Sequence, residues 1–127
     1  MPKPSTDIPH LKDFKKAVAN LRHPLRLKKT EIVRDSAIKR FEICFDLAWK
    51  CLQVHARREG LDCQSPRACL KVAYKLGLID YEKKWLKILA DRNLAVHTYK
   101  EKFAEKLFKR LPDYADLLDR LAETLSL

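Results

Sequence analysis

The sequence predicts an all-α fold. Apolar residues recur at intervals of three and four along nearly the whole chain, which is the period of a helix buried on one face. The chain contains only 2 glycines, which argues against a β-rich fold with many tight turns. With 127 residues, of which 46% are hydrophobic, it has the size of one domain and can bury a core. We therefore expect residues 1–127 to form a single helical domain.

The first two predicted helices are bounded by residues that favour helix ends. The apolar stripe of the first helix consists of Leu11, Phe14, Val18, Leu21 and Leu25. Pro24 suits the end of this helix, and a basic connector follows it. The second helix is expected from about Glu31 to Glu59, because Gly60 readily takes the left-handed conformation that closes a helix.

Three more helices are predicted in the second half of the chain. Ser65-Pro66 has the residue types of an N-cap and a first helical position, and this helix ends at Gly77. Asp80 can cap a fourth helix that spans Tyr81 to about Lys100. A last helix should continue to Leu125, with a kink or a restart at Pro112.

The second predicted helix is apolar around most of its circumference. Large apolar residues, among them Phe41, Ile43, Leu47 and Trp49, cover an arc of more than roughly 200° at 100° per residue. A peripheral helix needs an apolar stripe of only about 100°. We therefore predict burial against a second copy of the chain, in a homodimer built around this helix. The alternative is a helix that lies fully central within one protomer.

Composition limits the classes of function. Lys and Arg number 27 against 17 Asp and Glu, a net charge of +10 that favours polyanionic partners such as nucleic acid. The basic segment from Lys12 to Lys29 is either an RNA footprint or a solvated face. No glycine-rich phosphate loop or dinucleotide fingerprint is present. No segment has the apolar length of a membrane span or of a signal peptide, so we expect a cytoplasmic protein that does not bind membranes.

The four cysteines lie at positions 44, 51, 63 and 69. Their spacing contains no Cys-x-x-Cys pair and matches no zinc motif. We therefore expect four reduced, mostly buried thiols, no metal site and no cofactor.

The fourth predicted helix carries a charge where an apolar residue is expected. Trp85, Leu89, Val96 and Phe103 project onto one stripe, and Arg92 falls in its middle. An arginine in this position must reach solvent, pair with a carboxylate or line a cleft. Glu42 and Asp46 are candidate carboxylate partners.

The residues around Arg92 suit the cleavage of RNA without a metal ion. Arginine binds phosphate oxygens through two donors, and histidine takes or gives a proton near neutral pH. Cleavage by the 2′-hydroxyl of RNA needs only proton transfer and a cation for the developing charge. Arg92 and His97 diverge by about 140° on one helix, but two copies across a dimer axis could bring them together. The plainer interpretation is an arginine–carboxylate pair in the bundle, with His97 bonded to a backbone carbonyl.

Several short motifs together resemble the HEPN-type nucleotidyltransferase substrate-binding family, which includes the HepT-like toxins of HepT/MNT toxin–antitoxin pairs. The similar segments are Arg40-Phe41-Glu42, Asp46 to Lys50, Ser65-Pro66-Arg67, Gly77 to Asp80, Trp85-Leu86, Asp91-Arg92-Asn93 and His97-Thr98-Tyr99. They lie in the family's order within about residues 31–110. The resemblance implies an antiparallel, up-and-down bundle of four or five helices that dimerises with its Arg-x4-His motifs at the interface.

The resemblance also implies roles and partners. Arg92 and His97 would be the catalytic residues of a metal-independent endoribonuclease toxin, with Asn93 and Glu42 supporting them. A minimal nucleotidyltransferase would be the antitoxin and would transfer AMP to Tyr99, which places a bulky anion beside the arginine. An older interpretation of the same family is a noncatalytic subunit that holds the substrate of a two-component nucleotidyltransferase. An RNA-binding bundle without a partner is the third possibility.

Overall fold

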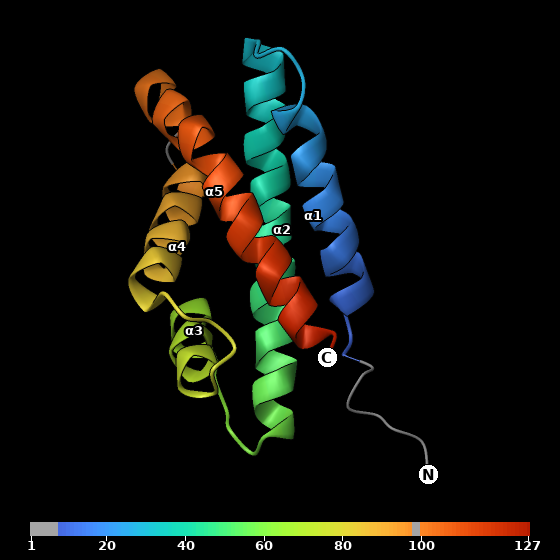
Figure 1. Cartoon of the computed structure of the whole chain (residues 1–127). Coiled ribbons are helices and arrows are strands. Elements are labelled where there is room, and N and C mark those ends of the chain that lie inside the picture. The colour runs from blue at the N-terminus through green and yellow to red at the C-terminus, as the bar shows by residue number, and fades with distance from the viewer. Residues whose placement is uncertain (1–7, 98–99) are drawn as a thin grey trace.

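The computed structural model describes residues 8–97 and 100–127, and it forms five helices without a strand in these ranges (Figure 1). The helices are α1 (Leu11–Leu25), α2 (Glu31–Arg58), α3 (Pro66–Lys75), α4 (Glu82–His97) and α5 (Glu101–Leu125). The long helices α1, α2, α4 and α5 alternate in direction along the chain, and the short α3 lies beside the lower part of α2 (Figure 1). The predicted all-α class is confirmed.

Helix α2 lies at the centre of the bundle. It packs against α1, α3, α4 and α5, and the rings of Phe41 and Phe45 are fully buried among them. The other four helices of the chain therefore cover most of the broad apolar arc that the sequence shows. Ile43 in the same arc stays 48% exposed, and the homodimer stays a prediction.

Local sequence signals set most helix ends as predicted. Ser65 caps α3, because its Oγ accepts a hydrogen bond of 3.2 Å from the backbone N–H of Ala68. Thr30 caps α2 in the same way, with 3.1 Å between its Oγ1 and the N–H of Val33. Gly60 and Gly77 have φ angles of 79° and 76°, in the left-handed region that residues with a Cβ rarely adopt.

The boundary between the last two helices differs from the prediction. Helix α4 ends at His97 rather than near Lys100, and α5 begins at Glu101. Helix α5 then runs through Pro112 to Leu125 without a restart. Pro112 is exposed, so its ring and its missing N–H face the solvent side of the helix.

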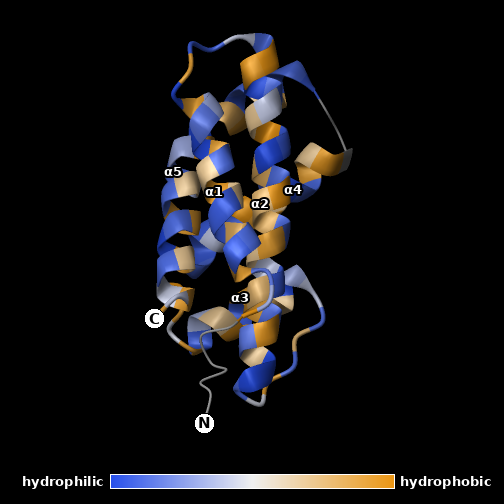
Figure 2. Cartoon of the chain, turned by 90° about the vertical axis from the view of Figure 1, so that its right-hand side faces the viewer, coloured by the Kyte–Doolittle hydropathy of each residue, from blue (hydrophilic) through white to orange (hydrophobic). Residues whose placement is uncertain are grey.

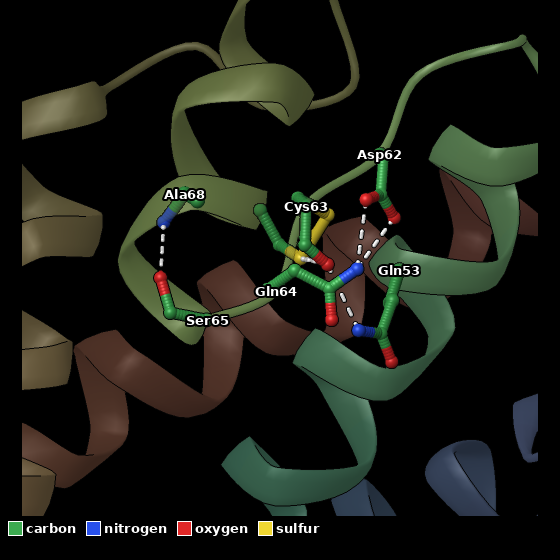
Figure 3. The surroundings of a disulfide bond; sticks show 7 residues. Gln53, Asp62, Cys63, Gln64, Ser65 and Ala68 are labelled. Carbon is green, nitrogen blue, oxygen red and sulfur yellow. Dashed lines mark hydrogen bonds between the residues drawn. A yellow bond between two sulfur atoms is a disulfide. The ribbon is translucent and has the colours of Figure 1, made fainter.

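The prediction of four reduced cysteines is wrong for two of them. Cys63 and Cys69 form a disulfide with 5.1 Å between their Cα atoms, which ties the segment before α3 to the first turns of that helix (Figure 3). Gln53 of α2 donates a hydrogen bond of 2.8 Å to the carbonyl of Cys63 and holds this segment against the bundle. Cys44 and Cys51 are free and buried, as expected.

Polar side chains cover most of the outer faces of the helices. Hydrophobic residues alternate with hydrophilic ones along each helix (Figure 2), so that each helix turns one side to the core. The lysines of the basic segment from Lys12 to Lys29 are exposed, whereas Arg22 is half-buried and paired with Asp116 and Asp119. Within residues 8–97 and 100–127, no helix combines the length and the apolar character needed to cross a bilayer.

Candidate functional site

Arg92 lies on α4 where this helix faces α2, and its guanidinium is held by a carboxylate. Nη2 donates to Oδ1 of Asp46 at 2.7 Å, which confirms one of the two predicted carboxylate partners. Nη1 donates to the side-chain oxygen of Asn93 at 3.1 Å. The Nε–H is buried and has no hydrogen-bond partner among the residues that the structure describes. The side chain is 24% exposed, so the guanidinium is partly open to an incoming group.

The predicted apolar stripe around Arg92 is only partly correct. Trp85 and Leu89 are buried, but Val96 is 48% exposed and Phe103 belongs to α5. The predicted stripe requires one continuous helix across residues 85–103. Because α4 ends at His97, Phe103 does not share a helical face with Trp85 and Leu89. Arg92 therefore lies at the edge of the core, next to an exposed apolar residue, rather than inside a sealed seam.

Glu42 faces a groove beside Arg92. The groove has a volume of about 470 Å³ between α2 and α4, and its lining residues are Asp35, Ile38, Lys39, Glu42, Ala95 and Val96. Burial raises the pKa of the Glu42 carboxyl, while Lys39, with Nζ 3.9 Å away, and Arg92 act in the opposite direction. The protonation of the Glu42 carboxyl therefore depends on the nearby cations Lys39 and Arg92.

Of the other three predicted site residues, the structure describes the side chain of Asn93 but not those of His97 and Tyr99. Asn93 is exposed and its amide orients the Arg92 guanidinium. His97 is the last residue of α4, and its side chain lies outside the described residues, as does the whole of Tyr99. Arg92, Asn93, Asp46 and Glu42 therefore form the described part of the site.

A buried acidic centre next to Arg92 has no predicted role from the sequence. Asp91 is 1% exposed and receives two hydrogen bonds from Nη1 of Arg110, at 3.0 and 2.9 Å. The hydroxyl of Tyr114 donates a third, at 2.5 Å, and hydrogen bonding to Asp91 and burial both raise the pKa of this phenol, burial most. These bonds join α4 to α5 at the residue before Arg92. The sequence signal for it is spacing, because Asp91 lies three residues after Ile88 and four before Ala95, on the buried face of the helix.

A second ion-pair cluster joins the start of α2 to the start of α5. Arg34 is almost fully buried, and its guanidinium donates to Asp35, Glu101 and Glu105 at 2.8 to 3.0 Å. Lys29 binds the same Glu105 carboxylate, and these two cations, Lys29 first, lower the pKa of Glu105. The cluster fixes the chain just after the segment that links α4 and α5.

The described residues contain no group of three or more His, Cys, Asp or Glu side chains placed to hold a metal ion. The chemistry of the described site is therefore that of an arginine, an amide and two carboxylates beside a groove.

Comparison with known proteins places the chain in a family. Residues 9–127 match the family model described as nucleotidyltransferase substrate binding protein like. A crystal structure of a protein from Thermus thermophilus shares 38% identity, with 90% of this chain and 99% of that chain covered and a TM-score of 0.84. No protein of curated function matches the sequence.

Two more distant structures share the fold. HI0074 from Haemophilus influenzae, described as a substrate binding domain of a nucleotidyltransferase, is 19% identical, with 92% and 99% of the two chains covered and a TM-score of 0.80. A mutant of the MntA-HpeT toxin-antitoxin is 18% identical, with 93% and 92% covered and a TM-score of 0.69. On the match of the family model across residues 9–127, this chain belongs to the nucleotidyltransferase substrate-binding protein-like family.

Proposed function

We propose that this protein is the RNA-cleaving toxin of a toxin–antitoxin pair and that a minimal nucleotidyltransferase is its partner. The observation that carries the proposal is the Arg92 side chain, which is 24% exposed at the edge of the core and bonds to Asn93. Phosphate oxygens are strong acceptors for the donors of an arginine. The toxin–antitoxin relative supports the assignment as a toxin, and the family description supports a nucleotidyltransferase as the partner.

The proposed reaction uses the 2′-hydroxyl of RNA as its nucleophile. His97 takes the proton of this hydroxyl, the oxygen attacks the adjacent phosphorus, and the bond from phosphorus to the 5′-oxygen breaks. A second proton, from the same imidazole or from its copy in the partner subunit, reaches the leaving oxygen. Arg92 stabilises the charge that develops on the phosphoryl oxygens, and Asn93 keeps its guanidinium oriented.

Asp46 has a defined part in this scheme. In the free protein its carboxylate neutralises Arg92 across 2.7 Å, so an RNA phosphate competes with it for the guanidinium. Because the Asp46 side chain is 39% exposed, it can turn to water when phosphate binds. Glu42, which lines the groove between α2 and α4, supports the site from its edge.

The proposal includes a homodimer with the site at its interface. On one helix Arg92 and His97 point about 140° apart, so the two groups need a second copy to converge. Val96 on α4 lines the groove, and Ile43 is an exposed apolar residue of α2. Each is 48% exposed, which favours an apolar contact with a second copy of the chain.

Sedimentation equilibrium tests the dimer. The wild type should sediment as a dimer and the Ile43→Asp variant as a monomer, since a buried carboxylate at an interface is costly. Leu27→Asp is the matched control, because Leu27 is also 48% exposed but lies in the connector after α1. A monomeric wild type, or equal behaviour of the two variants, contradicts the interface.

Cleavage is tested by incubating purified protein and labelled RNA in excess EDTA. The wild type should cut the RNA, and Arg92→Ala and His97→Ala should each lower the rate by a factor of about 100 or more. Arg57→Ala and His55→Ala on α2 serve as matched controls. Intact RNA with every protein, together with equal growth of cells that express them, would remove the proposed ribonuclease.

Regulation is proposed to act through Tyr99. Its phenol oxygen attacks the α-phosphorus of ATP on the partner nucleotidyltransferase, pyrophosphate leaves, and the added AMP blocks RNA by its size and charge. Intact-mass measurement after co-expression with the partner should show one added adenylate that the Tyr99→Phe variant lacks. An unchanged mass of the wild type would contradict this step.

The second candidate function is a noncatalytic subunit that presents substrate to a nucleotidyltransferase. The bond between Arg92 and Asp46 favours it, because a guanidinium already paired with a carboxylate has less charge left to stabilise a phosphoryl transition state. In this case the wild type leaves RNA intact, yet Arg92→Ala lowers the activity of the partner transferase. The two functions therefore differ in the EDTA assay.

A further inference from the structure

A second groove lies on the other flank of α4, between its first turns and the middle of α5. Its volume is about 510 Å³, against about 470 Å³ for the groove beside Arg92. The lining residues that matter here are Tyr81, Lys83, Lys84, Lys87, Asp113 and Arg120. None of the described site residues Glu42, Asp46, Arg92 and Asn93 lines it.

The groove carries an excess of uncompensated positive charge. Lys83, Lys84 and Arg120 have no carboxylate within ion-pair distance in the described part of the chain, and Lys87 has only a long contact to Asp91, at 3.9 Å. Asp116 also lines the groove, but Arg22 holds its carboxylate at 2.8 Å. Among the described lining residues, four cations therefore face the single remaining carboxylate of Asp113. Such a surface attracts a ligand with several negative charges.

An aromatic ring borders these cations. Tyr81 is 51% exposed, and Nζ of Lys84 lies 4.6 Å from the centre of its ring. A half-exposed ring beside lysines provides a stacking face for a base next to donors for its phosphates. Tyr114 closes the floor of the groove and stays fixed, because its hydroxyl donates to Asp91. Asp113 adds an acceptor for base amino groups or for a ribose hydroxyl.

The groove and Arg92 lie on different sides of one helix. Lys84, Lys87 and Asp91 follow each other at helical spacing on the side of α4 that faces α5, whereas Arg92 bonds to Asp46 of α2. The distance from Lys84 to Arg92 along the helix axis is about 12 Å, at 1.5 Å per residue. One nucleic-acid strand can therefore contact both by crossing α4.

We propose that this α4/α5 groove binds a segment of single-stranded RNA, with phosphates on Lys83, Lys84, Lys87 and Arg120 and a base on Tyr81. The inference deepens the proposed function and rests on it, because it assigns part of the RNA substrate to a surface away from the cleavage centre. Stacking on Tyr81 requires an unpaired base, so the site discriminates against duplex RNA.

The test measures binding of a fluorescent, uridine-rich single-stranded RNA to the full chain by anisotropy, in EDTA and about 0.1 M salt. The protein carries Arg92→Ala, so that the probe stays intact. The logarithm of the binding constant falls linearly with the logarithm of the salt concentration, and each phosphate contact on a single strand contributes about 0.7 to this slope. At about 0.1 M salt, one such contact therefore strengthens binding about fivefold. The added pair Lys84→Gln and Arg120→Gln should therefore weaken binding by about 25-fold and lower the slope by about 1.4.

The control pair is Arg67→Gln and Lys71→Gln on α3, which removes the same charge from positions outside the groove. It should change the affinity by less than about twofold. Tyr81→Ala should weaken RNA binding by at least about fivefold while leaving the binding of inorganic polyphosphate unchanged. Circular dichroism verifies that each variant is helical.

The outcomes separate the groove from the cleavage centre. Equal losses in the two charge pairs show binding by overall charge only, and no loss in the groove pair shows binding elsewhere; either result overturns the inference. If the groove pair loses affinity but the wild type never cuts RNA, the groove is upheld and the ribonuclease fails. If the wild type cuts RNA and the groove pair binds it normally, only the groove is refuted.

Discussion

Replacing Arg110 by methionine removes the cation that compensates a buried carboxylate. The Asp91 side chain is 2% exposed, and two of its hydrogen bonds come from Arg110. In the Arg110→Met variant this carboxylate keeps only the bond from Tyr114 and a distant Lys87, at 3.9 Å. A buried charge without its partner has to be desolvated at a cost that the remaining bond only partly offsets.

The magnitude follows from the geometry. Breaking a buried ion pair costs about 3–5 kcal/mol in general. The Arg110 side chain is 34% exposed and the Tyr114 hydroxyl still donates, so we expect a loss at or below the low end, about 2–3 kcal/mol. At about 2.1 cal/mol/K per residue the unfolding entropy of 127 residues is about 270 cal/mol/K. The Tm should therefore fall by about 7–11 °C.

Urea and thermal unfolding of matched variants measure this loss. Lys109→Met is the control, because Lys109 is the neighbour of Arg110 on α5, and it should change the free energy of unfolding by less than about 0.5 kcal/mol. Tyr114→Phe should cost about 1.5–3 kcal/mol, since it removes a hydrogen bond to a charged group. If Arg110→Met is no less stable than Lys109→Met, the Asp91 centre does not hold α4 against α5, and the reasoning is refuted.

Three further predictions concern titration and thiols. Ion pairs lower the pKa of the Glu105 carboxyl from 4.5, so the ionised carboxylate stabilises the fold above that pH and loses this effect as the pH falls. In urea titrations Glu105→Gln should lose less stability than the wild type between about pH 5 and about pH 3, and equal losses would contradict the ion pairs. Burial raises the pKa of Cys44 and of Cys51 to about 12, so neither thiol should react with a thiol reagent in the native protein at about pH 8. In the denatured protein 2 thiols should titrate without reductant and 4 with reductant, and 4 thiols under both conditions would exclude the disulfide. Arg92→Met should raise the pKa of the Glu42 carboxyl, because it removes a cation that opposes the effect of burial. Carboxyl ¹³C NMR measures this pKa, and an unchanged pKa would show that the two side chains are not coupled.

Local sequence patterns determined the class of the fold and most of its helix ends. Ser65 and Thr30 cap their helices through their own side chains, and Gly60 and Gly77 take left-handed backbone because no Cβ opposes it. These signals act within a few residues, so the sequence alone reveals them. The pairing of Arg92 with a carboxylate of α2 was also predictable, because a charge among apolar residues requires a partner. The predicted single domain, the dimer, and the roles of His97 and Tyr99 stay predictions.

Tertiary structure decided the features that join distant parts of the chain. Asp91 meets Arg110 and Tyr114 only because α5 returns along α4, and no local period links residues 19 and 23 positions apart. Cys63 and Cys69 are only six positions apart in the sequence, yet their pairing also depends on the folded path, because the segment before α3 turns back on the start of that helix. The sequence shows which side chains cannot remain alone in a core. The folded chain selects their partners, because electrostatic and disulfide contacts depend on distance in space.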